Sequence, residues 1–72
     1  MHRTYEEAYA AHYPQFQKAY KSAPLQACVG ARKDIYETLV HHYGRAAYEG
    51  KLMAELDAAR ERIMVLSRSA AA

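Results

Sequence analysis

The stretch that decides the fold is KLMAELDAARERIMVLS, residues 51–67. Its apolar side chains recur at spacings of four and three residues, at Leu52, Leu56, Ala59, Ile63 and Leu66. This spacing places them on one face of an α-helix and leaves the charged residues between them on the other faces. A helix with one apolar face has to bury it against another element, so the stretch predicts a helical bundle.

The N-terminal segment predicts a helix over residues 4–21. Thr4 and Glu7 match a capping box, in which the hydroxyl accepts a backbone N–H and the carboxylate reaches back. The helical spacing of rings and small side chains then continues through Pro14. Because an internal proline costs about 3 kcal/mol, we expect a bend there or a division into helices 4–12 and 14–22. The unbroken spacing favours the bend.

A second helix is expected over residues 24–48, because proline is favoured at the first helical position, here Pro24. Gly30 is interpreted as a point where another backbone comes close, since glycine inside a helix costs about 1 kcal/mol relative to alanine. Val29, Tyr36, Val40 and Tyr43 widen the predicted core face of this helix to one side, and the face itself carries Leu25, Cys28, Arg32, Ile35, Leu39, His42 and Ala46.

Gly44 and Gly50 bracket the connection to the third helix. Either could end a helix in the left-handed conformation, or residues 24–68 could form one long helix. The apolar faces before and after the glycines are out of phase by one residue. We therefore favour a turn between 44 and 50, a third helix over 50–67, and a frayed tail over 67–72.

The expected fold is all-α, a single helical domain over residues 1–72 built as a three-helix bundle. Helices 24–48 and 50–67 form an antiparallel hairpin, and the kinked N-terminal helix packs on it. A domain of this size buries only roughly 60% of its unfolded surface, and Leu, Ile, Val and Phe total 11 of 72 residues. Tyrosine must supply part of the core, and we expect a homodimer to supply further buried surface.

Composition predicts a soluble cytoplasmic protein that does not enter a membrane. Cys28 is the single cysteine, so no disulfide can form within the chain, and a free thiol is typical of reducing compartments. No apolar run approaches the roughly 18 residues of a membrane span, and no signal peptide is recognisable. Fifteen alanines and an excess of arginine over lysine are typical of a GC-rich bacterial, phage or plasmid coding sequence.

Four tyrosines, Tyr5, Tyr9, Tyr13 and Tyr20, are the predicted partner-binding residues. They share one face of a helix that contains no leucine, isoleucine or valine. Their rings could pack on the other helices with hydroxyls at the rim, or stand exposed as a recognition surface, where tyrosine is enriched. We favour a non-enzymatic module that binds another protein, as an accessory, regulatory or inhibitor protein of phage or plasmid type.

The alternative function is a dimeric DNA-binding regulator that uses Arg32, Lys33 and Arg45. The net charge of +2 is spread evenly and forms no basic arm. Asp34 and Glu37 also lie close to the two basic residues in the sequence. These observations make DNA binding the second choice.

No metal, cofactor or catalytic site is expected. Glu37 and His41 lie one helical turn apart, but zinc asks for three or four ligands. Cys28 is interpreted as a small apolar core residue. A chain of 72 residues in helices leaves little room for a pocket that excludes water.

Overall fold

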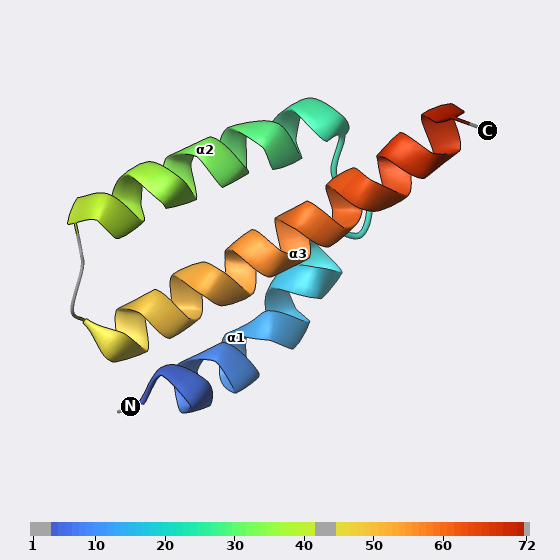
Figure 1. The fold of residues 1–72 in the computed structure, drawn as a ribbon. Helices are drawn as coiled ribbons and strands as arrows, with labels where there is room; N and C mark the ends of the chain where they lie inside the picture. Colours follow the sequence, from blue (N-terminus) through green and yellow to red (C-terminus); the bar gives the residue numbers. More distant parts are fainter. Residues whose placement is uncertain (1–3, 42–44, 72) are drawn as a thin grey trace.

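The computed structural model describes residues 4–41 and 45–71, and all regular structure in these ranges is helical (Figure 1). Helix α1 spans Tyr5–Tyr20, α2 spans Leu25–His41 and α3 spans Ala46–Ala71. The prediction of an all-α, three-helix fold is confirmed. With 26 residues α3 is the longest helix, and α1 and α2 both pack mainly on it rather than on each other.

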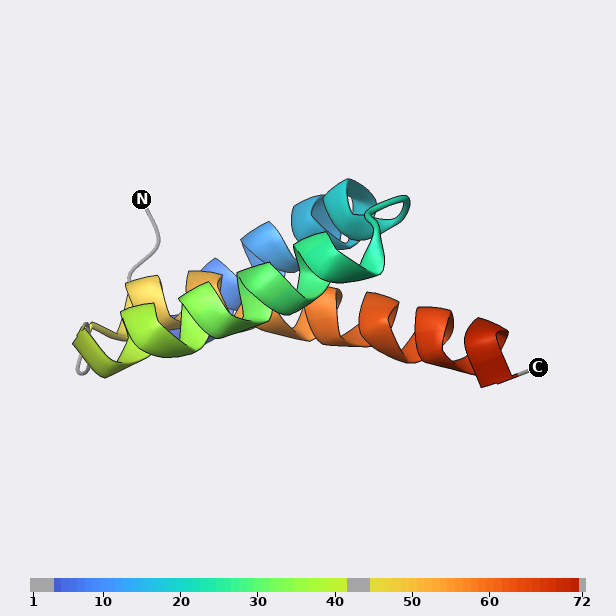
Figure 2. The same ribbon diagram turned by 90° about the horizontal axis from the view of Figure 1, so that it is seen from above.

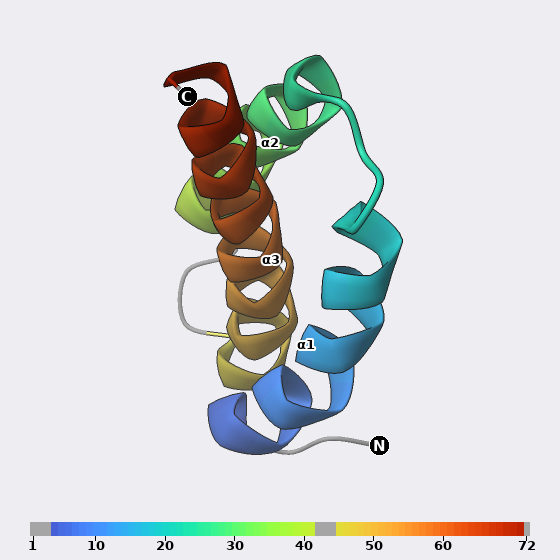
Figure 3. The same cartoon turned by 90° about the vertical axis from the view of Figure 1, so that its right-hand side faces the viewer.

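The helices run in alternating directions along the chain, so α1 and α3 are parallel and α2 is antiparallel to both (Figure 1). The α2–α3 pair is the expected hairpin. Seen from above, the C-terminal end of α3 projects beyond the other two helices (Figure 2). Along α3, α1 stands apart from most of α2 and approaches it only at the connection between them (Figure 3).

Helix α1 begins and ends through local hydrogen bonds. The Thr4 side chain accepts the backbone N–H of Glu7 at 3.1 Å, which confirms the predicted cap. At the other end the Ala23 N–H donates to the Tyr20 carbonyl at 3.1 Å and closes a turn before α2. Pro14 lies inside a single helix of 16 residues, so the division into two helices is wrong.

The connection between α2 and α3 corrects the predicted boundaries. The chain forms two separate helices here, as favoured over one long helix. However, α2 already ends at His41, and α3 begins at Ala46. The Glu49 N–H bonds to the Arg45 carbonyl at 2.8 Å in the first turn of α3. Gly50 is therefore inside the helix and does not end one. His42, Tyr43 and Gly44 lie outside the described residues.

The C-terminal tail also differs from the expectation. Helix α3 continues to Ala71, so the prediction of fraying from residue 67 is wrong. Alanine has the highest helix propensity of all residues, and the tail ends in a run of alanines. Propensity thus extends the helix where no apolar face requires it.

Of the two packing faces on α3, the one that receives α2 is the face identified from the sequence. Leu52 and Leu56 form the buried core cluster with Ile35 of α2, and Leu39 and Met53 pack against it. Cys28 is fully buried on the same side of α2, as its interpretation as a core residue required. This packing face is less covered toward the projecting end of α3, where Ile63 and Leu66 are only half-buried.

The second packing face of α3 consists of small residues and receives α1. Gly50, Ala54 and Ala58 recur every four residues and are all buried. Ala8 is the buried residue of α1. Small side chains on both helices let the two backbones approach closely, and a Cβ at Gly50 would collide with the backbone of Tyr5.

The prediction that another backbone comes close to Gly30 is wrong. A Cβ built on Gly30 meets nothing within 4 Å, so Gly30 marks no contact. The approach occurs at Gly50 instead. The sequence of one helix shows where its glycines lie. It does not show which of them a second helix approaches, because that neighbour comes from a distant part of the chain.

Candidate protein-binding surfaces

Tyr5, Tyr9 and Tyr13 form a row of stacked rings along α1, called here the tyrosine row. The Tyr5 and Tyr9 ring centroids lie 6.1 Å apart with 14° between the ring planes. For Tyr9 and Tyr13 the values are 5.4 Å and 8°. One helical turn separates successive members, so the helix itself sets the stacking distance. All three rings are half-buried.

Two hydroxyls of the tyrosine row reach across to carboxylates of α3. Tyr9 donates to Oδ2 of Asp57 at 2.5 Å, and Tyr13 donates to Oε1 of Glu61. Both pairs are separated by 48 residues in sequence, so one parallel register between α1 and α3 makes both. Hydrogen bonds to an ionised acceptor are about twice as strong as neutral ones.

Tyr20 holds the other end of α1 on the opposite flank of α3. Its hydroxyl donates to Oε2 of Glu55 at 2.7 Å. Glu55 and Asp57 are two residues apart and so point about 200° apart around the helix axis. Tyrosines of α1 therefore form hydrogen bonds to both flanks of α3, Tyr9 on one flank and Tyr20 on the other.

The electrostatic environment keeps these phenols protonated. The hydrogen bond to Asp57, and then burial, raises the pKa of Tyr9 well above its ordinary value. Burial, and then the hydrogen bond to Glu55, does the same to the pKa of Tyr20. For Tyr13 the hydrogen bond to Glu61 is the main cause of a raised pKa. In each case the neutral phenol is the donor that the neighbouring carboxylate requires.

The structure thus places all four predicted partner-binding tyrosines on the side of α1 that faces α3, with Tyr5, Tyr9 and Tyr13 in one row and Tyr20 at the other end of the helix. The hydroxyls of Tyr9, Tyr13 and Tyr20 are engaged within the chain, as expected if the rings pack with hydroxyls at the rim. That a partner binds Tyr5, Tyr9, Tyr13 and Tyr20 stays a prediction. Any such partner would meet the exposed edges of rings that already fasten α1 to α3.

A different helix carries the most continuous exposed apolar surface. Four large side chains along one face of α2 remain accessible, called here the outer stripe: Leu25 at 46%, Val29 at 40%, Tyr36 at 50% and Val40 at 75%. Their spacings of four, seven and four residues keep them within about 60° around the helix axis. Sequence reasoning assigned all four to the core or to its widened edge.

The outer stripe is exposed because α3 covers an adjacent face of α2. The covered face contains Cys28 and Ile35, which lie about 100° around the helix from the stripe. No third helix fills the remaining angle, since α1 packs mainly on α3. Met64 and Val65, on the projecting part of α3, are the other strongly exposed aliphatic residues, at 54% and 48%.

The three basic residues of the DNA-binding alternative are not gathered into one cluster. Arg32 is half-buried and Lys33 exposed in the middle of α2, whereas Arg45 is exposed at the start of α3. About 14 Å of helix separates Arg32 from the end of α2, before the connection begins. DNA binding by these residues stays a prediction.

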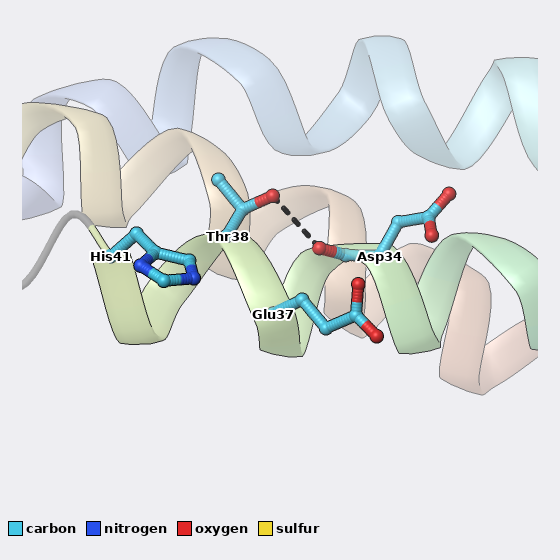
Figure 4. Close-up of a pocket in the computed structure, with 4 residues that line it drawn as sticks. All are labelled: Asp34, Glu37, Thr38 and His41. Atoms are coloured by element: carbon cyan, nitrogen blue, oxygen red, sulfur yellow. Dashed lines mark hydrogen bonds between the residues drawn. The ribbon is translucent and has the colours of Figure 1, made fainter.

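A shallow polar groove runs along α2, lined by Asp34, Glu37, Thr38 and His41 (Figure 4). The Thr38 hydroxyl donates to the backbone carbonyl of Asp34 at 2.8 Å. The Glu37 carboxylate points toward Asp34 and away from the His41 ring (Figure 4). Nowhere in residues 4–41 and 45–71 do three His, Cys, Asp or Glu side chains gather as a metal site would require.

Comparison with known proteins identifies no relative. The chain matches no protein-family model, no curated protein and no solved structure. Within the described residues, each helix is too short or too polar to cross a membrane.

Proposed function

We propose that the chain is a non-enzymatic protein-interaction module whose contact surface is the outer stripe of α2. The observation that supports this is the exposure of four large apolar side chains in one line on one helix. Contiguous exposed apolar surface on a small protein is typical of interaction sites. A helix presenting anchors at such spacing fits an apolar groove or a second helix.

The tyrosine row is the weaker candidate for the contact surface. Tyr9, Tyr13 and Tyr20 each donate a hydrogen bond to α3, so a partner that drew them away would break those bonds. The side chains of the outer stripe are exposed, and docking on them breaks none of these bonds.

The module is proposed to act as a dimer in the cytoplasm. Its core cluster holds three large buried side chains, Ile35, Leu52 and Leu56, which is little for a domain of 72 residues. A second subunit stabilises such a fold by mass action. The single thiol, Cys28, fits a reducing compartment.

The experiment compares two matched double variants in an affinity capture with the tagged chain, followed by binding of the purified captured protein. Val29→Ser with Val40→Ser changes the outer stripe, and Met64→Ser with Val65→Ser changes exposed aliphatic residues elsewhere. The first pair should abolish binding while circular dichroism stays unchanged, and the second should retain it. Binding that survives the first pair but is lost in Tyr13→Ser would return the contact surface to α1.

The same purified proteins also distinguish the DNA-binding alternative from the proposed protein-binding function. A gel shift titrated with salt should show no complex at low salt if the module binds only proteins. Phosphate-driven binding would appear at low salt and fall steeply as salt rises. A complex that weakens with salt in this way, and that Lys33→Gln with Arg45→Gln abolishes, would replace the present proposal with a DNA-binding one.

A further inference from the structure

Charged side chains flank the outer stripe in a pattern that is complementary to itself. Lys33 and Glu37 are exposed, one helical turn apart, and lie on the same flank of the stripe. Arg32 is half-buried and lies along the helix between Val29 and Tyr36, at the edge of the stripe nearer to the covered face. Along this face the helix therefore offers apolar side chains at both ends, and cations, a ring and a carboxylate in the middle.

We propose that a second copy of this chain occupies the outer stripe, with the two α2 helices antiparallel about a twofold axis near residues 34 and 35. The inference rests on the proposed function, because it names the partner of the same surface. In an isologous pair each contact occurs twice, and antiparallel helices bring the same flank of both copies together.

One register then satisfies the whole face. It places Val29 opposite Val40 of the second copy, and Lys33 beside Glu37 of the second copy. It also places Arg32 over the ring of Tyr36 in the second copy, a favourable cation–π arrangement. A parallel pairing in register would instead leave Lys33 and Glu37 of the two copies on opposite sides of the interface, where neither Lys33–Glu37 pair could form.

The size of the surface sets the expected affinity. The outer stripe spans 16 residues, about 22 Å of helix. An interface built mainly on one helix belongs to the small, weak class. We therefore expect a dimer that dissociates at micromolar concentration.

The test measures the dimer dissociation constant of the full chain by sedimentation across micromolar concentrations. Lys33→Glu and Glu37→Lys should each weaken the dimer by about tenfold, because two pairs change from attraction to repulsion. The double variant, with the charges exchanged, should restore wild-type affinity. Mixing the two single variants should produce a heterodimer, since one copy is then acidic and the other basic at both positions.

Asp34→Asn is the matched control, because position 34 lies on the far side of α2 from the stripe and asparagine offers Glu37 no competing cation, and it should leave the dissociation constant unchanged. A dimer that is disrupted by Val29→Ser and Val40→Ser but not restored by the charge exchange would overturn the antiparallel pairing and keep the stripe as the contact surface. A chain that stays monomeric at submillimolar concentration would overturn the inference. The proposed function would still stand if the stripe then bound a different purified protein.

Discussion

Gly50 of α3 lies directly against the backbone carbonyl of Tyr5 in α1. A Cβ at position 50 would overlap the carbonyl oxygen and come within 3.0 Å of the carbonyl carbon. The neighbour is backbone, which cannot move aside as the end of a side chain could. This contact fixes the separation of two parallel helices at the end where the Tyr9 hydroxyl reaches Asp57.

Gly50→Ala should lower the free energy of unfolding by about 1 to 2 kcal/mol. Alanine improves helix propensity by about 1 kcal/mol, but overpacking a close contact costs typically 1–3 kcal/mol, and here α1 would have to shift as a whole. Urea denaturation followed by circular dichroism measures the difference. Gly30→Ala is the control, because nothing lies within 4 Å of its added Cβ, and it should stabilise the protein by about 1 kcal/mol. Equal effects at the two positions would contradict the close approach.

The hydrogen bond between Tyr9 and Asp57 should appear as a coupling energy in a double-mutant cycle. Tyr9→Phe removes the donor and keeps the ring, and Asp57→Ala removes the acceptor. Each single change should cost about 1 to 2 kcal/mol, as expected for a hydrogen bond to a charged group that is partly buried. The double variant should cost less than the sum of the two. Strictly additive costs would show that the hydroxyl contributes nothing through Asp57.

Some of the fold could be predicted from residues that act within one helix. The spacing of Leu52, Leu56 and Ala59 identified a packing face, and all three are buried. Thr4 was recognised as a cap because its partner, Glu7, is three residues away and the rule is local. Both predictions needed only the geometry of a single helix.

The packing between helices could not be predicted in the same way. Tyr9 and Asp57 are separated by 48 residues, and no local rule pairs them. The same holds for Gly50, whose role depends on Tyr5. Helix α3 has two packing faces, and the face of small residues gives little hydropathy signal because alanine and glycine bury little apolar surface. The outer stripe was assigned to the core because sequence spacing cannot tell which part of a wide apolar face a neighbour covers.

Arg62 should matter more to stability than its charge indicates. Its Nε donates to the backbone carbonyl of Ala23 at 3.0 Å, which fastens the connection between α1 and α2 to α3. Arg62→Ala should lower the free energy of unfolding by about 1.5 to 3 kcal/mol, the range for a charge-assisted hydrogen bond. Arg60→Ala, at an exposed position of the same helix, should change it by less than about 0.5 kcal/mol. Urea denaturation of both variants at neutral pH measures the two effects. Indistinguishable midpoints would show that the hydrogen bond from Arg62 to Ala23 does not stabilise the fold.

The raised pKa values of Tyr9 and Tyr20 predict that stability falls at alkaline pH. Because each pKa is raised from 10.0 on folding, the native state holds these protons more tightly than the unfolded state. The stabilisation is therefore fully present below about pH 10 and is lost as the pH rises through the folded-state values. Denaturation midpoints measured from neutral pH upward should decline above about pH 10, and Tyr9→Phe with Tyr20→Phe should make the decline shallower. Tyr36→Phe, a conservative change on the exposed face of α2, should keep the wild-type profile. A double variant as steep as wild type would mean that other groups, such as the lysines, cause the loss.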